Sequence, residues 1–164
     1  MTAGRWFGLL VAALVFESLS GAIGAVTPWG FWLRLFFSPF LALAILAALQ
    51  GKAGSAMAVA VVAGLLHDAW FSGWYGESAF CFLVVAFLIS RIASRFDLLQ
   101  LFPAGAALFL GAAADRALRS GLAGMFDLPE GDPGSHWFWV VRAVGTVILG
   151  LLVLPLLEKG RGRP

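Results

Sequence analysis

The sequence predicts an all-α integral membrane protein: one compact bundle of six transmembrane helices with both termini in the cytoplasm. Of its 164 residues, 61% are hydrophobic and 12% are charged, whereas soluble proteins average about 25% charged residues. The mean hydropathy is +0.93. The apolar residues form long stretches of about 17–25 residues, the length that lets an α-helix cross a bilayer. No segment is long enough for a separate soluble domain, so residues 1–164 are expected to form a single membrane domain.

Six apolar segments are expected to be the helices. They comprise residues 6–26, 34–50, 55–70, 77–93, 102–125 and 137–157. Turn-forming or polar residues separate them, at 27–30, 51–54, 71–76, 91–97 and 127–136. Pro39 stands near the start of the second helix, where proline is tolerated. The first segment resembles a secretory signal peptide, but Glu17 within it argues against cleavage, so we expect it to remain as the first span.

Two residue types indicate the orientation of the bundle. With six spans, the first, third and fifth connections share one side of the membrane. The tryptophans expected at that interface are Trp29, Trp32, Trp70, Trp74, Trp137 and Trp139. The basic residues expected on the side of the termini are Arg5, Lys52, Arg91, Arg95, Lys159, Arg161 and Arg163. An aromatic belt and the positive-inside rule then place both termini in the cytoplasm.

A small-residue stripe ends in an acid within the third segment. Positions four residues apart share one face of a helix, and they give the series Ala56, Ala60, Gly64 and Asp68. A turn containing Gly73 and Gly76 follows. In lipid such a stripe lets a neighbouring backbone come close, and the acid must face protein or water. Three interpretations of Asp68 stay open: it is solvated at the outer interface, it caps the amides of Ser72 or Gly73, or it contacts a partner.

Ionisable residues inside a span are costly and need a partner or a water path. The candidates besides His67 and Asp68 are Glu17, Asp115, Arg116, Arg119 and Arg142. Asp115 and Arg119 are four residues apart and are expected to pair within one helix. A pairing of Glu17 with Arg142 across the bundle is a further hypothesis.

Three further small-residue stripes fit either packing inside the bundle or contact with a partner helix. They are Gly4/Gly8/Ala12, Ala107/Gly111 and Ala117/Gly121.

No pattern in the sequence indicates catalysis, a cofactor or a metal site. His67 and Asp68 are adjacent and point about 100° apart on a helix, so they are not a catalytic pair by themselves. Two histidines without a cysteine cluster or an H-E-x-x-H motif predict no metal site. Cys81 is the single cysteine, which excludes an internal disulfide. A net charge of +2 gives no reason to expect nucleic acid binding.

The Gly64-to-Gly76 stretch resembles the MreD family of bacterial rod shape-determining proteins. In that family a helix ends in G-x-x-x-D, a glycine-containing turn follows, and the next apolar helix is closed by basic residues. Gly64, Asp68, Gly76 and Arg91 match these features in order, and the plan of six spans extends the resemblance to the whole chain. His67 stands where the family often has an aliphatic residue, and the turn is unusually aromatic.

The resemblance implies a non-catalytic scaffold subunit of the cell-elongation machinery in the bacterial inner membrane. Its partner would be MreC, through a transmembrane helix and the adjacent region, and indirectly MreB and the peptidoglycan synthases, with membrane lipid around it. The alternative is the substrate-binding subunit of a vitamin-type, energy-coupling-factor transporter. It would need an outward pocket near Trp70, Trp74, Trp137 and His136. A lipid-handling protein that uses the charges of the fifth segment is a third hypothesis.

Overall fold

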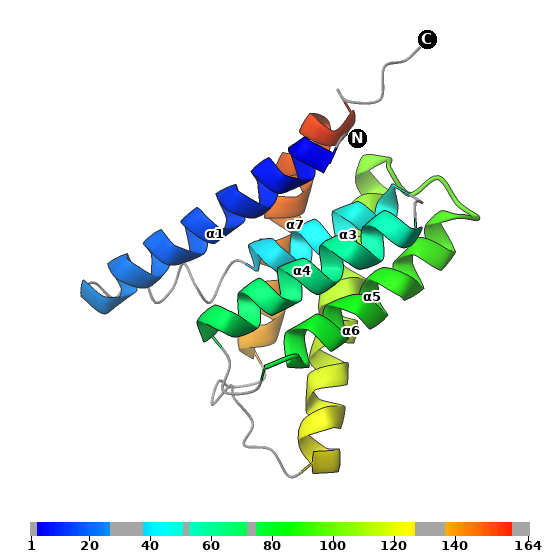
Figure 1. Ribbon diagram of the computed structural model, residues 1–164. Coiled ribbons are helices and arrows are strands. Elements are labelled where there is room, and N and C mark those ends of the chain that lie inside the picture. The colour runs from blue at the N-terminus through cyan, green and yellow to red at the C-terminus, as the bar shows by residue number, and fades with distance from the viewer. Residues whose placement is uncertain (1–2, 27–37, 51–52, 72–74, 127–136, 159–164) are drawn as a thin grey trace.

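The computed structural model describes residues 3–26, 38–50, 53–71, 75–126 and 137–158, and six helices lie within them (Figure 1). They are α1 (Ala3–Val26), α3 (Pro39–Leu49), α4 (Ala53–Phe71), α5 (Glu77–Ala93), α6 (Leu101–Phe126) and α7 (Trp137–Glu158). Each expected segment corresponds to one of these helices, with ends that differ by up to three residues where both ends are described. Residues 34–37 of the second segment lie outside the described residues. Proline is at the start of α3, where its missing N–H costs no helical hydrogen bond.

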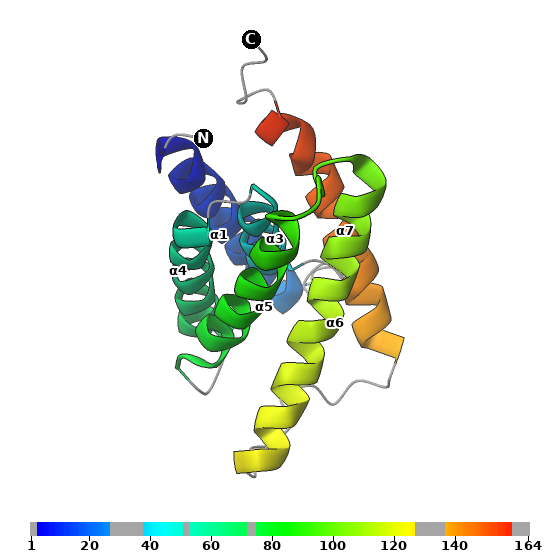
Figure 2. The same cartoon turned by 90° about the vertical axis from the view of Figure 1, so that its right-hand side faces the viewer.

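Helix α3 is the centre of the molecule. It contacts each of the other five described helices, and all eleven of its residues are buried. Its sequence is apolar on every side, which is typical of a helix surrounded by protein. Figure 2 shows α3 behind α5, with α4 on one side of it and the α6–α7 pair on the other.

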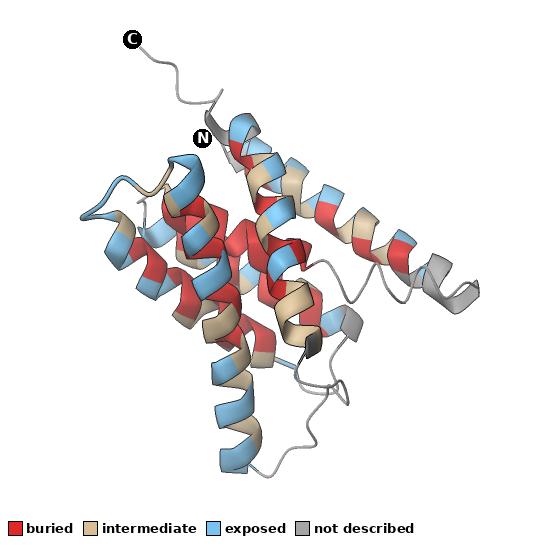
Figure 3. Cartoon of the chain, turned by 180° about the vertical axis from the view of Figure 1, so that it is seen from behind, coloured by how far each residue is buried: buried red, intermediate tan, exposed pale blue. Residues whose placement is uncertain are grey.

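Much of α1 and the last turns of α6 are exposed. Helix α1 packs against α3 and α4, and much of its outer face is exposed (Figure 3). The last turns of α6 project beyond the neighbouring helices in all three ribbon views. The outer surface carries large apolar side chains, such as Phe102 at 87% exposed and Leu152 at 70%. Apolar surface on this scale is expected to be covered, and lipid is the cover that a membrane supplies.

Two of the described helices are long and apolar enough to cross a membrane: Leu101–Phe126 and Phe138–Pro155. The apolar helices Pro39–Leu49 and Ala53–Ala69 are shorter. The first turn of α1 and the last turn of α7 lie at the same end of the bundle, together with the connection between α5 and α6 (Figure 1). An even number of spans requires the start of α1 and the end of α7 to lie at the same end, as they do here. That all six helices cross the membrane, and which end faces the cytoplasm, stay predictions.

Candidate functional site

Helices α4 and α5 are in direct backbone contact at Gly64. A Cβ atom at this position would overlap the backbone N and Cα of Ala79 and lie 2.7 Å from the carbonyl carbon of Ser78. Ala56 and Ala60, on the same face of α4, are fully buried. These three positions of the stripe are therefore packed inside the protein, which agrees with the packing interpretation.

The Asp68 carboxylate caps the first turn of α5. Its Oδ2 atom accepts hydrogen bonds from the backbone N–H groups of Gly76 at 2.9 Å and Ala79 at 3.3 Å. The N–H of Ser78 donates to both oxygens at 3.1 Å. Asp68 is only 1% exposed, so these amides and the positive end of the α5 dipole compensate its buried charge. The cap described here acts on the amides of Gly76, Ser78 and Ala79. Ser72 and Gly73, whose amides were the expected ones, lie outside the described residues.

The backbone conformation of Gly76 allows the turn in which Asp68 caps α5. Gly76 is the residue before α5 and has a φ of 98°, in the left-handed region that glycine adopts without strain. Because glycine has no side chain, it cannot cap the helix itself in the usual way. The carboxylate that caps α5 therefore comes from the preceding helix, and it fixes the α4–α5 junction.

His67 is next to Asp68 in the sequence, and its side chain contacts the Ser78 hydroxyl and two phenylalanine rings. Its Nδ1 atom is 3.0 Å from the Ser78 hydroxyl oxygen. The imidazole ring packs edge-on against Phe82, at 5.8 Å between ring centroids, and against Phe40 at 6.5 Å. His67 is thus a buried packing residue that also contacts the Ser78 hydroxyl, which agrees with its position on an otherwise apolar helix.

Arg119 on α6 binds side chains of two helices. Its Nε donates to Asp115 Oδ2 at 3.1 Å, the intrahelical pair that the four-residue spacing predicts. Its Nη1 donates to Glu77 Oε1 at 3.2 Å. Its Nη2 donates to the Ser78 hydroxyl at 2.8 Å. The same hydroxyl contacts His67, so a continuous polar network, here called the arginine hub, links α4, α5 and α6. Its members are His67, Glu77, Ser78, Asp115 and Arg119.

The hub is charged but largely enclosed. The side chains of Asp115, Arg119 and Glu77 are 7%, 19% and 23% exposed. Asp115 Oδ1 is buried and accepts no hydrogen bond from the described part of the chain. The ion pair with Arg119 is therefore the main compensation for this carboxylate.

The other predicted charges lie on α1, α6 and α7. Arg142 on α7 donates to the Ser38 hydroxyl at 3.4 Å. Glu17 is buried on α1, and its pairing with Arg142 stays a prediction. Arg116 is half-buried on α6.

Sequence reasoning missed Glu77 and Ser78 as members of the site. Glu77 was expected only as the first residue of the fourth segment, and Ser78 carried no expectation. A signal for them did exist. If Asp68 caps the helix that follows the turn, the polar residues at the start of that helix lie near Asp68. Nothing in the sequence signals their contact with Arg119, 41 and 42 residues further along.

The remaining small-residue stripes divide into covered and exposed ones. Gly111 is covered, since a Cβ there would lie 2.6 Å from Ile45 Cδ1 and 3.0 Å from Ile89 Cδ1. In contrast, Gly4, Gly8 and Gly121 have no neighbouring atom within 4 Å of a Cβ position. Ala12 and Ala117, the other members of these two stripes, are exposed as well.

The chemistry of the described site is structural. The three guanidinium nitrogens of Arg119 are each engaged within the hub, and Asp68 is engaged by backbone amides. Within the described residues, no group of three or more His, Cys, Asp or Glu side chains is arranged to hold a metal ion. Cys81 is a buried free thiol.

Replacing Gly64 with alanine should lower the free energy of unfolding by about 1–3 kcal/mol. The added methyl group meets backbone atoms of α5, which cannot rotate away, so the two helices must separate. Gly8→Ala is the matched control, because a methyl group there meets open space. Thermal unfolding of the detergent-solubilised proteins measures both changes. Equal unfolding temperatures for Gly64→Ala and Gly8→Ala would contradict the close contact.

The fold and the site together define an α-helical membrane protein whose polar residues hold its own helices together. Comparison with known families then identifies it more closely. The model of rod shape-determining protein MreD matches residues 5–157, nearly the whole chain, and the chain belongs to the MreD family. That family determines rod shape and is not known for catalysis. Comparisons with curated proteins and with solved structures gave no match.

Proposed function

We propose that this protein is a non-catalytic scaffold subunit of the bacterial cell-elongation machinery, where it binds MreC and helps to organise the peptidoglycan synthases. The observation that carries the proposal is the family match over residues 5–157. The geometry adds to it, since the buried polar groups engage one another and so favour a structural role over a reaction. Because these polar groups contact one another, they give no support to the hypothesis of a vitamin-type transporter, which needs polar groups that bind a ligand.

We further propose six membrane crossings in the inner membrane, with both termini in the cytoplasm. Three described arginines, Arg5, Arg91 and Arg95, come from helix ends at the end of the bundle where α1 begins and α7 ends. Basic residues concentrate on the cytoplasmic side of bacterial membrane proteins. This supports an orientation in which the α4–α5 junction faces the other side.

The burial of the small residues limits where MreC could dock. The stripe through Gly64 is occupied by α5, so the motif that carries the family resemblance supports the fold rather than the interface. The stripes that remain open are Gly4/Gly8/Ala12 on α1 and Ala117/Gly121 on α6. Small residues let a transmembrane partner approach closely, so the proposed contact with the MreC helix uses one of these two faces.

Co-expression with MreC and purification from detergent test the proposal. Wild type should yield a stoichiometric complex. Either Gly8→Leu or Gly121→Leu should reduce recovery of the complex by about tenfold, the effect of losing 1–2 kcal/mol of helix packing. Gly54→Leu is the control, because Gly54 is also exposed in open space but belongs to neither stripe. Absence of a complex with wild type would overturn the scaffold function, and normal recovery with both stripe variants would overturn the assigned faces.

A further inference from the structure

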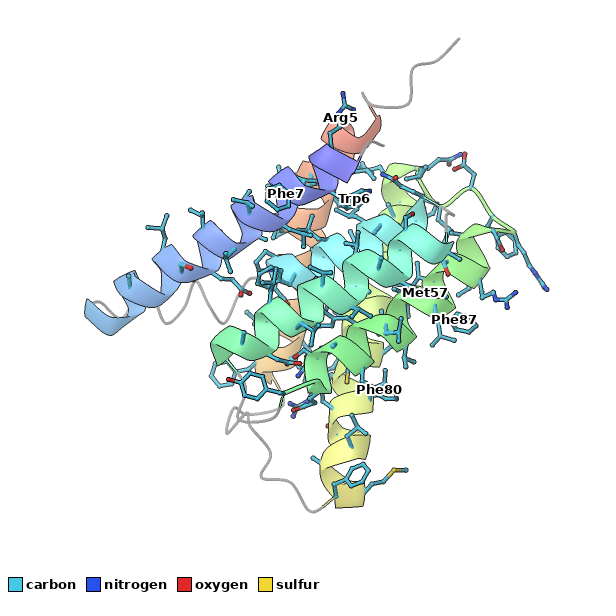
Figure 4. The ribbon with its side chains drawn as sticks, viewed as in Figure 1. Arg5, Trp6, Phe7, Met57, Phe80 and Phe87 are labelled. Carbon is cyan, nitrogen blue, oxygen red and sulfur yellow. The ribbon has the colours of Figure 1, made fainter. Side chains whose placement is uncertain are left out.

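The outward face of α5 is apolar along its length. Phe80 is 50% exposed, Phe87 39% and Leu88 49%. Figure 4 shows Phe80 and Phe87 projecting away from the bundle. Ile92 at 50% and Phe96 at 63% exposed continue this surface to the end of the helix and beyond it.

Two arginines stand at the end of that apolar face. Arg91 is in the last turn of α5, and Arg95 follows two residues beyond the end of that helix. Both side chains are exposed. The Arg91 guanidinium lies over the Phe87 ring, 5.2 Å from its centroid. The exposed Arg91 guanidinium therefore lies next to the apolar surface.

Neither arginine has an acidic partner in the described part of the chain. The ion pairs found there involve other residues. Asp97 is the acid nearest to them in the sequence, and its Oδ1 atom accepts a hydrogen bond from the Leu99 amide at 3.4 Å. The two exposed guanidinium groups thus remain available to an external anion.

We propose that Arg91 and Arg95 bind the headgroup phosphate of an anionic phospholipid whose acyl chains lie along Phe87, Leu88 and Ile92. Guanidinium groups form paired hydrogen bonds with phosphate oxygens. Basic residues at the boundary of a bilayer attract anionic headgroups. The continuous apolar face next to the charges selects a lipid over free phosphate, because only a lipid also covers that face. The inference rests on the proposed membrane crossing of α5 and is independent of MreC.

Native mass spectrometry of the purified full chain, without MreC, provides the test. Phosphatidylglycerol and phosphatidylcholine are titrated in separate arms, and a third arm adds inorganic phosphate as competitor. Wild type should bind phosphatidylglycerol about tenfold more tightly than phosphatidylcholine, as expected for two basic contacts. The double variant Arg91→Gln/Arg95→Gln should lose this preference. Arg5→Gln, which removes an exposed arginine on α1, should keep it.

Three outcomes would overturn the proposal. They are an unchanged preference in the double variant, an equal loss in Arg5→Gln, and displacement of the lipid by millimolar inorganic phosphate. All the substituted side chains are exposed, so equal unfolding temperatures are expected and serve as the check that each variant is folded. Failure of the lipid proposal would leave the MreC copurification result unaffected, because that experiment substitutes different residues.

Discussion

Arg119→Leu should lower the free energy of unfolding by about 3–5 kcal/mol, the largest effect expected of any single substitution proposed for this protein. The change removes the partner of the enclosed Asp115 carboxylate and the donors to Glu77 and Ser78. It also removes the guanidinium that lies 5.8 Å from the centroid of the Phe82 ring. Thermal unfolding in detergent measures the loss, with Arg5→Leu, an exposed arginine, as the matched control.

The double variant Arg119→Leu/Asp115→Leu separates charge burial from simple loss of packing. An unpaired buried carboxylate is the costly element, and an apolar pair in its place is often neutral. The double variant should therefore recover much of the stability that the single variant loses. A double variant no more stable than Arg119→Leu would show that the ion pair is not what the hub contributes.

Asp68→Leu should lower the free energy of unfolding by about 2–4 kcal/mol. Loss of a helix cap costs about 0.5–2 kcal/mol, and buried amides left without an acceptor add to it. Asp68→Asn keeps one acceptor oxygen and should lie between wild type and Asp68→Leu. Hydrogen exchange at the start of α5 should increase in the same order. Wild-type exchange rates in Asp68→Leu would contradict the cap.

The variant Asp68→Leu also distinguishes a structural role of Asp68 from a direct contact with a partner. If the carboxylate acts only through the α4–α5 junction, the yield of MreC complex should fall in proportion to the folded fraction of Asp68→Leu. Copurification normalised to the monodisperse fraction measures this. A complex lost from fully folded protein would assign Asp68 to the interface instead.

Much of the local structure could be predicted from the sequence because it depends on neighbouring residues. The apolar segments predict the helices, and α5 spans the expected residues 77–93. The ion pair between Asp115 and Arg119 follows from their spacing on one helix. Each of these features is determined by periodicity within a single helix.

The assembly of the site could not be predicted in this way. Periodicity shows that Gly64 has a small-residue face, but it does not show that α5 covers that face. It likewise places Arg119 on α6 without indicating which helix end its side chain reaches. The contacts of Arg119 with Glu77 and Ser78 depend on which helices are adjacent, and an apolar helix carries little information about its neighbours.

The complete enclosure of α3 has a consequence for how the protein could evolve. A helix with one lipid-facing side can exchange one large apolar residue for another on that side at little cost, because lipid adapts to its shape. Helix α3 has no such side, since every residue from Pro39 to Leu49 meets other parts of the protein. Any change of volume there must be matched by a change in a surrounding helix, so the eleven residues can vary only together with their neighbours.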